Sequence, residues 1–365
     1  MRINKETLQG YILEEILAYL IKNAGYRLLT DPCQDPYELD RKGNGLVVKG
    51  RGSIHQADVL GQLEWIPTFV FPIRLFIEAK FRQEKTGIQA IRNAIGVLYD
   101  INQNFIKPKD KDIFRQRYSY NYAIFSTSGF TVNAIDLALA HNISLVDLSS
   151  TEYDELKQSI STASESIVNL NNNILTDVDE DNNELNINRS IYVKQIRDYI
   201  RSALDTDSFI RNAIININPT IDTNSKTILD SMVIIAQQYQ ELFIAMANGP
   251  FMLLLKANNI QSFKNYANNY PYHHVVITWN SESNNGQEWT IRPYNEPNAY
   301  KLSFKLPDKL AKWIFDKEGK PLSRALNIKE NFFSSITIYR RENGRDLLYR
   351  LEYNPETTQE FIKRF

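Results

Sequence analysis

The stretch LFIEAKF, residues 75–81, puts two charged side chains into an otherwise apolar run with strand character. Side chains of a β-strand alternate between its two faces, so Glu78 and Lys80 share one face, about 6.5–7 Å apart. The apolar residues of the other face are expected to contact the core: Leu75, Ile77, Ala79 and Phe81. Taken alone, this E-x-K pattern also fits a surface ion pair on an edge strand.

A second strand lies upstream, where HQADVLG, residues 55–61, places Asp58 inside another apolar run. A hairpin between the two strands brings Asp58 beside Glu78. The apolar segment LEWIPTFVFP, residues 63–72, makes the connection longer than a minimal hairpin needs, so the pairing register stays open. This insertion is a candidate wedge, dimer contact or lid.

Two carboxylates and a lysine at a strand junction suit metal-dependent cleavage of a phosphodiester. Mg2+ prefers carboxylate oxygens and keeps several of its waters. The ion lowers the pKa of a bound water and neutralises charge that develops on the phosphate. Lys80 is a candidate to orient or deprotonate that water, or to stabilise the developing charge.

Glu14 is a further candidate, within the helical run YILEEILAYLI, residues 11–21. It shares a helix face with Leu17 and Ile21, its i+3 and i+7 neighbours, whereas Glu15 lies on another face. We therefore expect Glu14 to turn inward, where a carboxylate needs a partner such as a metal ion or a lysine. The alternative is a glutamate at the surface edge of the apolar stripe.

The elements around these strands have a regular order in the first part of the chain. Apolar periodicity and end signals predict helices over Leu8–Ala24, Thr86–Asn102 and Thr131–His141. Strands are predicted over Gly45–Val48, Ser53–Leu60, Ile73–Phe81, Asn121–Ser126 and Ile143–Leu148. The order α-β-β-β-α-β-α-β favours an α/β fold, with a mixed sheet flanked by helices on both faces.

The length of 365 residues favours two domains, and the charge distribution indicates where they divide. The net charge of -1 argues against a nucleic-acid partner, but residues 1–150 carry +2, residues 151–185 carry -8 and residues 186–365 carry +5. We predict domains at 1–148 and 189–365, joined by an acidic, Asn-rich linker at 149–188. A weaker alternative is an acidic strand-mimic that covers a basic groove.

The second domain reads as α+β. Helices over Ile187–Ile215 and Lys226–Ala247 precede several β runs, and a helix is expected at Pro307–Phe315. The Asn-Gly pair at 343–344 between two β runs predicts a hairpin. The hairpin carries four arginines that either contact nucleic acid or form a solvated face: Arg340, Arg341, Arg345 and Arg350.

Several classes of protein are disfavoured. The single cysteine, Cys33, excludes a disulfide framework and a Cys-based zinc module. The adjacent His273 and His274 point to opposite faces of a strand, which argues against a zinc site. Trp289 is a core residue or a platform for a flipped base. No secretory or membrane-spanning segment is evident, so we expect a soluble, cytoplasmic protein.

At this point the pattern resembles a known family. The helix beginning Gly10-Tyr11-Ile12-Leu13-Glu14, then Asp58, Glu78-Ala79-Lys80 and the closing segment FSTSGFT at 125–131, is similar to the PD-(D/E)XK nuclease superfamily. It is closest to the Mrr-like restriction endonucleases, and the resemblance covers about residues 7–148. It implies a restriction-endonuclease-like sheet. Ala57 stands where the eponymous proline would be, and the insertion at 63–72 is a second departure.

The resemblance implies that Asp58 and Glu78 bind Mg2+, for which Mn2+ can substitute. Lys80 would assist the nucleophilic water and Glu14 would support the metal site. Weaker candidates for DNA contact are Lys49 and Arg51 in the loop KGRGS, and Gln89 and Arg92 on the next helix; a plain turn and a solvated helix face are the alternatives.

The expected function is therefore a Mg2+-dependent endonuclease acting on DNA, most simply double-stranded, in restriction or anti-phage defence. Cutting both strands needs two active sites, so we expect a homodimer. Two alternatives remain: a non-catalytic DNA-binding or assembly subunit on the same fold, and a defence effector nuclease activated by a partner protein.

Overall fold

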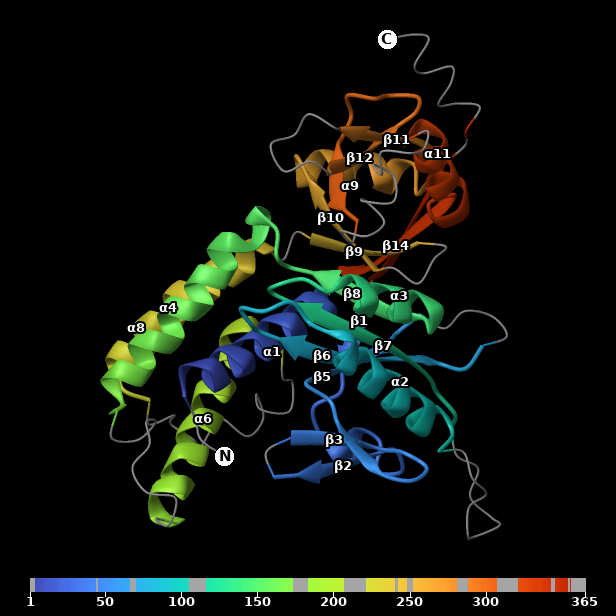
Figure 1. The fold of residues 1–365 in the computed structure, drawn as a ribbon. Helices are drawn as coiled ribbons and strands as arrows, with labels where there is room; N and C mark the ends of the chain where they lie inside the picture. Colours follow the sequence, from blue (N-terminus) through green and yellow to red (C-terminus); the bar gives the residue numbers. More distant parts are fainter. Residues whose placement is uncertain are drawn as a thin grey trace. The chain divides into compact units, whose positions relative to one another are not determined.

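The computed structural model describes residues 4–43, 45–65, 70–104, 116–172, 183–206, 221–239, 242–247, 252–280, 288–306, 321–342, 345–353 and 355. The chain divides into two compact units, one made of residues 1–129 and 147–240 and the other of residues 130–146 and 241–365. Helices and strands alternate through much of the chain (Figure 1), which confirms the predicted mixed α/β class. No helix in the described ranges is long and apolar enough to cross a membrane.

Helix α1 (Lys5–Asn23) is the central helix of the first unit. The side chain of Asn4 caps its first turn by accepting from the backbone N–H of Thr7 at 2.9 Å. Gly25, at φ 85°, ends the helix and turns the chain into strand β1 (Tyr26–Leu28). Twelve of the nineteen residues of α1 are buried, so neighbours cover it on more than one side.

A five-stranded sheet lies beside α1, in the order β1-β5-β6-β7-β8. Its further strands are β5 (Val59–Leu63), β6 (Ile73–Lys80), β7 (Ser119–Ser126) and β8 (Ile143–Asp147). Strands β5 and β6 are antiparallel, with Val59 opposite Ile77, which settles the register left open above. Strands β6 and β7 are parallel and are joined through helix α2 (Ile88–Asn102).

The predicted strand over residues 53–60 is in fact two strands that belong to different sheets. Its first part, β4 (Ile54–Gln56), joins a small sheet with β3 (Gly45–Lys49) and β2 (Leu39–Lys42). The N–H of Ala57 donates to Leu46 of the small sheet at 3.2 Å, and the N–H of Asp58 donates to Ile77 of the large sheet at 3.2 Å. The chain therefore passes from one sheet to the other between Ala57 and Asp58.

Strand β6 is buried on both faces in its central part. The expected core residues Leu75 and Ile77 are buried, and Arg74 and Phe76 on the opposite face are buried as well. Arg74 donates to a carboxylate oxygen of Asp35 at 2.6 Å and to the hydroxyl of Tyr120 at 3.0 Å. Both ends of the strand are partly open to solvent, Ile73 at its start and the residues from Glu78 onward.

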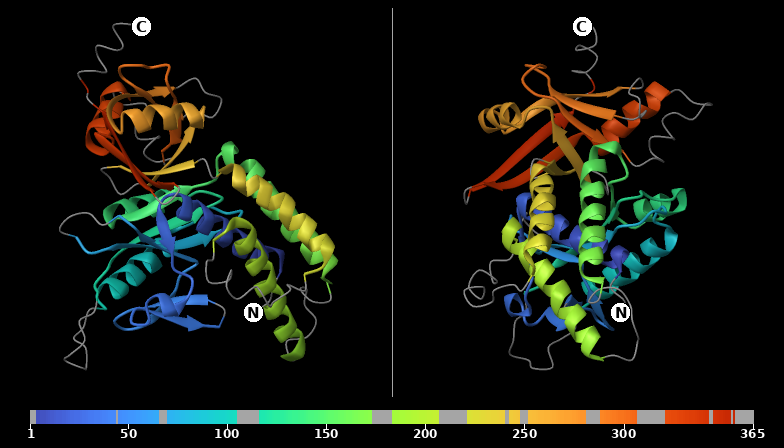
Figure 2. Two further views of the ribbon diagram at one scale, coloured as in Figure 1. Left: turned by 180° about the vertical axis from the view of Figure 1, so that it is seen from behind. Right: turned by 90° about the vertical axis from the view of Figure 1, so that its left-hand side faces the viewer.

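The acidic segment differs from the predicted linker. Residues Asp154–Leu170 form helix α4, because Leu156, Ile160 and Ile167 recur on one face and are buried. The high acid content hid this periodicity. Helix α4 and helix α6 (Asn183–Leu204) both contact α1, and α4 lies alongside α8 (Thr223–Gln238) in both views of Figure 2.

The predicted domain boundaries are corrected accordingly, because residues 147–240 belong to the first unit and not to a linker and a second domain. The part of the predicted linker at residues 173–182 lies outside the described residues, as do the predicted helix at 307–315 and the turn at 343–344.

The second unit contains a closed barrel of seven strands, in the order β10-β13-β12-β11-β15-β14-β9. Its strands are β9 (Leu242–Met246), β10 (Met252–Ala257), β11 (Tyr272–Asn280), β12 (Glu288–Pro293), β13 (Leu302–Lys305), β14 (Ser335–Glu342) and β15 (Arg345–Tyr353). Helices α9 (Ile260–Asn269) and α11 (Pro321–Phe332) accompany them, as does α3 (Val132–Ala140) in the same unit. The predicted helix 226–247 ends at Gln238, and its last residues form β9. Trp289 is fully buried and stacks on Phe304, so it is a core residue.

Candidate active site

Asp58 and Glu78 are brought together by the pairing of β5 with β6. Because Val59 lies opposite Ile77 in an antiparallel pair, Asp58 and Glu78 are the next residues of the two strands. One carboxylate oxygen of Asp58 accepts from the backbone N–H of Ala79 at 2.8 Å. The passage of the chain between the two sheets thus fixes the Asp58 carboxylate at the end of β6.

Glu78 and Lys80 lie on one face of β6, as the strand period predicts, and form an ion pair. About a fifth of each side chain is exposed, which leaves the pair accessible to solvent. The hydroxyl of Tyr122 donates to the other carboxylate oxygen of Glu78 at 2.8 Å. Burial, with the neighbouring Glu78 charge, raises the pKa of Tyr122 well above its ordinary value, so Tyr122 remains a hydrogen-bond donor.

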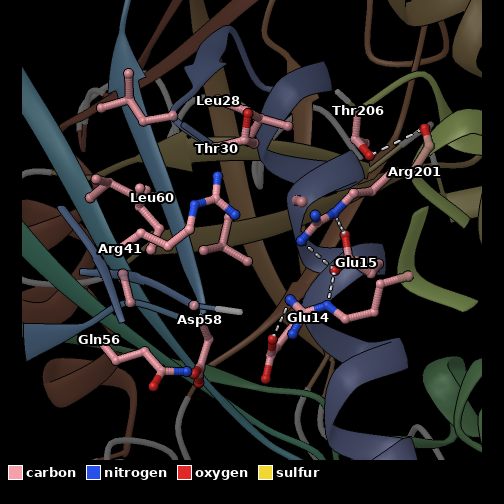
Figure 3. Close-up of a pocket in the computed structure, with 17 residues that line it drawn as sticks. Glu14, Glu15, Leu28, Thr30, Arg41, Gln56, Asp58, Leu60, Arg201 and Thr206 are labelled. Atoms are coloured by element: carbon pink, nitrogen blue, oxygen red, sulfur yellow. Dashed lines mark hydrogen bonds and ion pairs between the residues drawn. The ribbon is translucent and has the colours of Figure 1, made fainter. Parts of the chain in front are cut away.

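Glu14 and Asp58 line one pocket, together with Glu15, Arg197 and Arg201. Figure 3 shows Glu14 and Glu15 on helix α1 and Asp58, just before strand β5, on the other side of this pocket. Burial raises the pKa of Glu14 from 4.5 to about 8, against the opposing effect of Arg197, and the Asp58 charge adds to the rise. Burial also raises the pKa of Asp58. Both carboxyls therefore lie where a second cation would stabilise their ionised forms.

Two arginines of α6 bind the acids of α1, and the sequence analysis did not find them. Arg197 contacts Glu14 at 2.7 Å and Glu15 at 2.6 Å, and Arg201 donates two hydrogen bonds to Glu15 at 2.7 and 2.9 Å. Glu15 is only 2% exposed, so the expectation that Glu14 alone turns inward was incomplete. Although burial opposes ionisation, Arg201 and Arg197 hold the pKa of Glu15 below its ordinary value.

The predicted metal ligands meet the needs of Mg2+ only in part. The described residues contain no group of three or more His, Cys, Asp or Glu side chains that could hold a metal ion, so Asp58, Glu78 and Glu14 do not form a single ligand set. Mg2+ is commonly held by one or two carboxylates, with waters and substrate phosphate as the remaining ligands. The adjacent oxygen donors Asp58 and Glu78 have the chemistry for that mode, with Glu14 bound to Arg197 at one side.

The loop KGRGS, residues 49–53, is held by Asp100 at the end of α2. The carboxylate of Asp100 accepts from the backbone N–H of Gly52 at 2.8 Å and contacts the ring of His55 at 2.7 Å. The ammonium of Lys49 donates to the backbone at residue 36, whereas Arg51 is exposed. Lys49 and Arg51 were the two residues of this loop predicted to contact DNA, and of these Arg51 is the one with an exposed side chain.

The remaining candidates near the site have simpler roles. Gln89 and Arg92 are exposed on α2, and Gln89 donates to Asn93 of the same helix, as expected for a solvated helix face. The hydroxyl of Ser126 hydrogen-bonds with that of Thr86 at 2.9 Å. This contact ties the loop after β6 to the end of β7 and so supports the strand that carries Lys80.

The arginines of the barrel are not equivalent. Arg340 is 6% exposed and contacts Glu342 at 2.5 Å, so the expectation that it presents its charge to DNA is not met. Arg345 and Arg350 are exposed, and Arg350 contacts Glu352 at 3.0 Å. The side chain of Arg341 lies outside the described residues.

No protein-family model and no curated protein matches the chain. Among solved structures, the crystal structure of a protein of unknown function, AF1548, matches at 13% sequence identity with a TM-score of 0.33. That match covers 62% of this chain and 98% of the other. At such a score it carries no argument about fold or function.

Proposed function

We propose that the protein is a Mg2+-dependent DNA endonuclease, with a restriction-endonuclease-like sheet of the PD-(D/E)XK type in its first unit. The observation that carries the proposal is the pairing of β5 with β6, which sets Asp58 next to Glu78-Ala79-Lys80. Glu14 supports it, because a third carboxylate from α1 lines the pocket that contains Asp58. A catalytic role also accounts for the two charged residues, Glu78 and Lys80, at the partly open end of a strand whose middle is buried.

Phosphodiester hydrolysis needs an activated water and stabilisation of charge on phosphate. Asp58 and Glu78 would hold Mg2+, which when bound supplies a water of lowered pKa and neutralises phosphate charge. The ammonium of Lys80, held beside Glu78, can orient the attacking water or donate to a phosphate oxygen. The water oxygen bonds to phosphorus, the bridging P–O bond breaks, and a proton passes to the leaving oxygen.

DNA contacts away from the chemistry would come from exposed arginines on the two units, Arg51 on the KGRGS loop and Arg345 and Arg350 on the barrel. Because so few basic residues are involved, binding should weaken only moderately with salt. A homodimer would supply the second active site needed to cut both strands.

A partner-activated effector nuclease is the second candidate, and one observation favours it. The Glu14 carboxylate is bound by Arg197 rather than standing open at the site. A nuclease held in this state would have low activity until helix α6 moved. Activity that appears only with a partner protein would distinguish this candidate from a restriction enzyme. A non-catalytic DNA-binding or assembly subunit is disfavoured, since it would not need Asp58, Glu78 and Lys80 together.

The test is plasmid cleavage with three isosteric variants, Asp58→Asn, Glu78→Gln and Lys80→Met. Each should lower the Mg2+-dependent rate by about a hundredfold or more, because each removes a group from the proposed chemistry. EDTA should abolish wild-type cutting, and Mn2+ should restore it. The matched control is Glu84→Gln, an exposed acid in the loop after β6, which should cut as the wild type does. Cutting by all three site variants would refute the assignment.

The same assay can define the substrate. Methylated and unmethylated plasmids would show whether modification is required, and the ratio of nicked to linear product would show whether one or both strands are cut. A single-stranded RNA of similar length provides the comparison with an RNA substrate.

A further inference from the structure

The charged groups around the pocket nearly balance without any metal ion. Three acids line the pocket, Glu14, Glu15 and Asp58, and the two arginines of α6 line it as well. Next to Asp58, at the end of β6, the charge of Glu78 is paired with that of Lys80. The remaining cation that lines the pocket, Arg41, contacts Asp31 at 3.0 Å and is thereby balanced. At most one net negative charge is therefore left to attract a divalent cation.

Arg197 is the cation whose position matters most for that balance. Its guanidinium is the group that contacts both Glu14 and Glu15, and it lies over the ring of Tyr11, 4.9 Å from the centroid. Only 14% of the side chain is exposed. Arg201 lies one helical turn away and, among the described contacts of the site, binds Glu15 and not Glu14. The two arginines therefore carry the same charge, but only the Arg197 guanidinium is described in contact with Glu14.

We propose that Arg197 acts as an internal counter-ion that occupies the cation position beside Glu14 and so weakens metal binding at the active site. The inference rests on the proposed function, because it names a regulation of the same site. A guanidinium and a divalent cation repel each other at short distance in a pocket of low dielectric. The metal ion and Arg197 thus compete for the carboxylates that line the pocket.

Helix α6 would then be the element that regulates metal binding at the site. It is a separate element from strand β6, which carries Glu78, and from the bend before β5 that carries Asp58. Arg197 and Arg201 both belong to it. It contacts α1 and forms the ion pairs with Glu14 and Glu15, and its apolar residues Ile196 and Ile200 are buried. By linkage, if the docked helix weakens metal binding, bound metal must weaken docking of the helix by the same factor. A partner that draws α6 away from α1 would release Glu14 and raise the affinity for metal.

The first experiment compares Mn2+ affinity in the full chain of wild type, Arg197→Met and Arg201→Met, by electron paramagnetic resonance. Arg197→Met should bind Mn2+ about tenfold more tightly, which corresponds to ~1.4 kcal/mol. Glu15 keeps its two hydrogen bonds from Arg201 in that variant, so the fold should be retained. Arg201→Met removes the same charge without touching Glu14 and should change the affinity less than twofold. Arg197→Lys, which keeps the charge, should bind Mn2+ as the wild type does.

Weaker or unchanged Mn2+ binding in Arg197→Met would overturn the proposal, and so would equal gains in the two methionine variants. Failure of the inference differs from failure of the proposed function. A wild type that cuts DNA through Asp58 and Glu78, but whose metal affinity does not respond to Arg197, keeps the nuclease and loses the counter-ion.

A second measurement uses the wild-type chain and does not depend on the folding of a variant. Saturating Mn2+ should speed hydrogen exchange of the backbone amides of residues 193–204 in α6, because metal and Arg197 compete. Exchange in strand β7 serves as the internal reference. Slower or unchanged exchange in α6 would mean that metal binding and helix docking are not opposed, and would overturn the proposal.

Discussion

Arg74, the second residue of strand β6, has 1% of its surface exposed. Its charge is balanced by Asp35 at 2.6 Å, and its guanidinium lies 3.3 Å from the centroid of the Tyr118 ring. Arg74→Ala should therefore lower the free energy of unfolding by roughly 3–5 kcal/mol, because it leaves a largely buried carboxylate without its cation. Urea unfolding followed by circular dichroism measures the loss.

The control for Arg74 is Arg41, which contacts Asp31 at 3.0 Å with nearly half of its side chain exposed. Arg41→Ala should cost less than about 1 kcal/mol, as exposed ion pairs usually do. Equal losses for the two variants would show that the pair with Asp35 is not the source of the effect.

Lys329 on helix α11 is a buried cation in the second unit. It is 9% exposed, and its ammonium lies 5.9 Å from the ring centroid of Trp289 and 5.8 Å from that of Tyr353. Burial lowers the pKa of Lys329 from 10.5 to about 8. Between these values the unfolded chain holds the proton and the folded chain releases it, so stability rises with pH across that window. Below pH 8 the folded protein bears the full cost of the buried charge.

Lys329→Met should accordingly stabilise the protein at pH 7, by roughly 2 kcal/mol after loss of the aromatic contacts. The gain should shrink as the pH rises from 8 to 10.5, where the wild-type lysine is neutral in the folded state. Thermal melting of both proteins at several pH values measures it. Lys256→Met, on the exposed side of β10, should show no such pH dependence. A gain that stays constant across the window would contradict the account.

Strands and helices with a local apolar period were predictable from the sequence. Helices α1, α2 and α3 and strands β3, β6, β7 and β8 lie within a few residues of their predicted bounds. The Asp58, Glu78 and Lys80 positions followed from the same rule, because a strand period of two places Glu78 and Lys80 on one face. The period did not predict that Arg74 and Phe76, on the same face as Glu78 and Lys80, are buried.

Other elements depend on contacts that no local pattern records. Strand β1 has three residues and exists because it pairs with β5. The barrel closes through the pairing of β14 with β9, which joins segments about ninety residues apart in the chain. The Arg197–Glu15 contact spans 182 positions, so neither residue identifies the other in a single sequence. Only the i, i+4 spacing of Arg197 and Arg201, facing the Glu14-Glu15 pair, hinted at a cluster.

The net charge of -1 is a sum over parts of the chain that carry opposite net charges. Residues 151–185 contribute -8 to that sum, and part of that segment is helix α4, which contacts α1 and has a buried apolar face. Four further acids, Glu14, Glu15, Asp58 and Glu78, lie near cations at the candidate site. The net charge of the whole chain is therefore a poor guide to whether the proposed nuclease can bind nucleic acid, because charge acts through local patches.

The extent of the first unit can be tested by truncation. Helix α1 is covered by the sheet and also by α4 and α6, and Glu15 is compensated by Arg197 and Arg201. A fragment of residues 1–148, the predicted nuclease domain, would expose the apolar residues of α1 and leave Glu15 without both cations. We expect it to be poorly folded and to aggregate.

A fragment of residues 1–240 keeps α4 and α6 against α1, with α8 against α4 and α6, and should fold cooperatively. Dispersion of amide signals in a two-dimensional NMR spectrum, together with size-exclusion chromatography, distinguishes the two fragments. Glu15→Gln in the shorter fragment removes the uncompensated charge but not the exposed apolar surface, so it should recover little. A well-dispersed spectrum from residues 1–148 would show that the helices after the sheet are dispensable. That result would also show that the proposed active site forms without Arg197, so this residue would not be part of the catalytic unit.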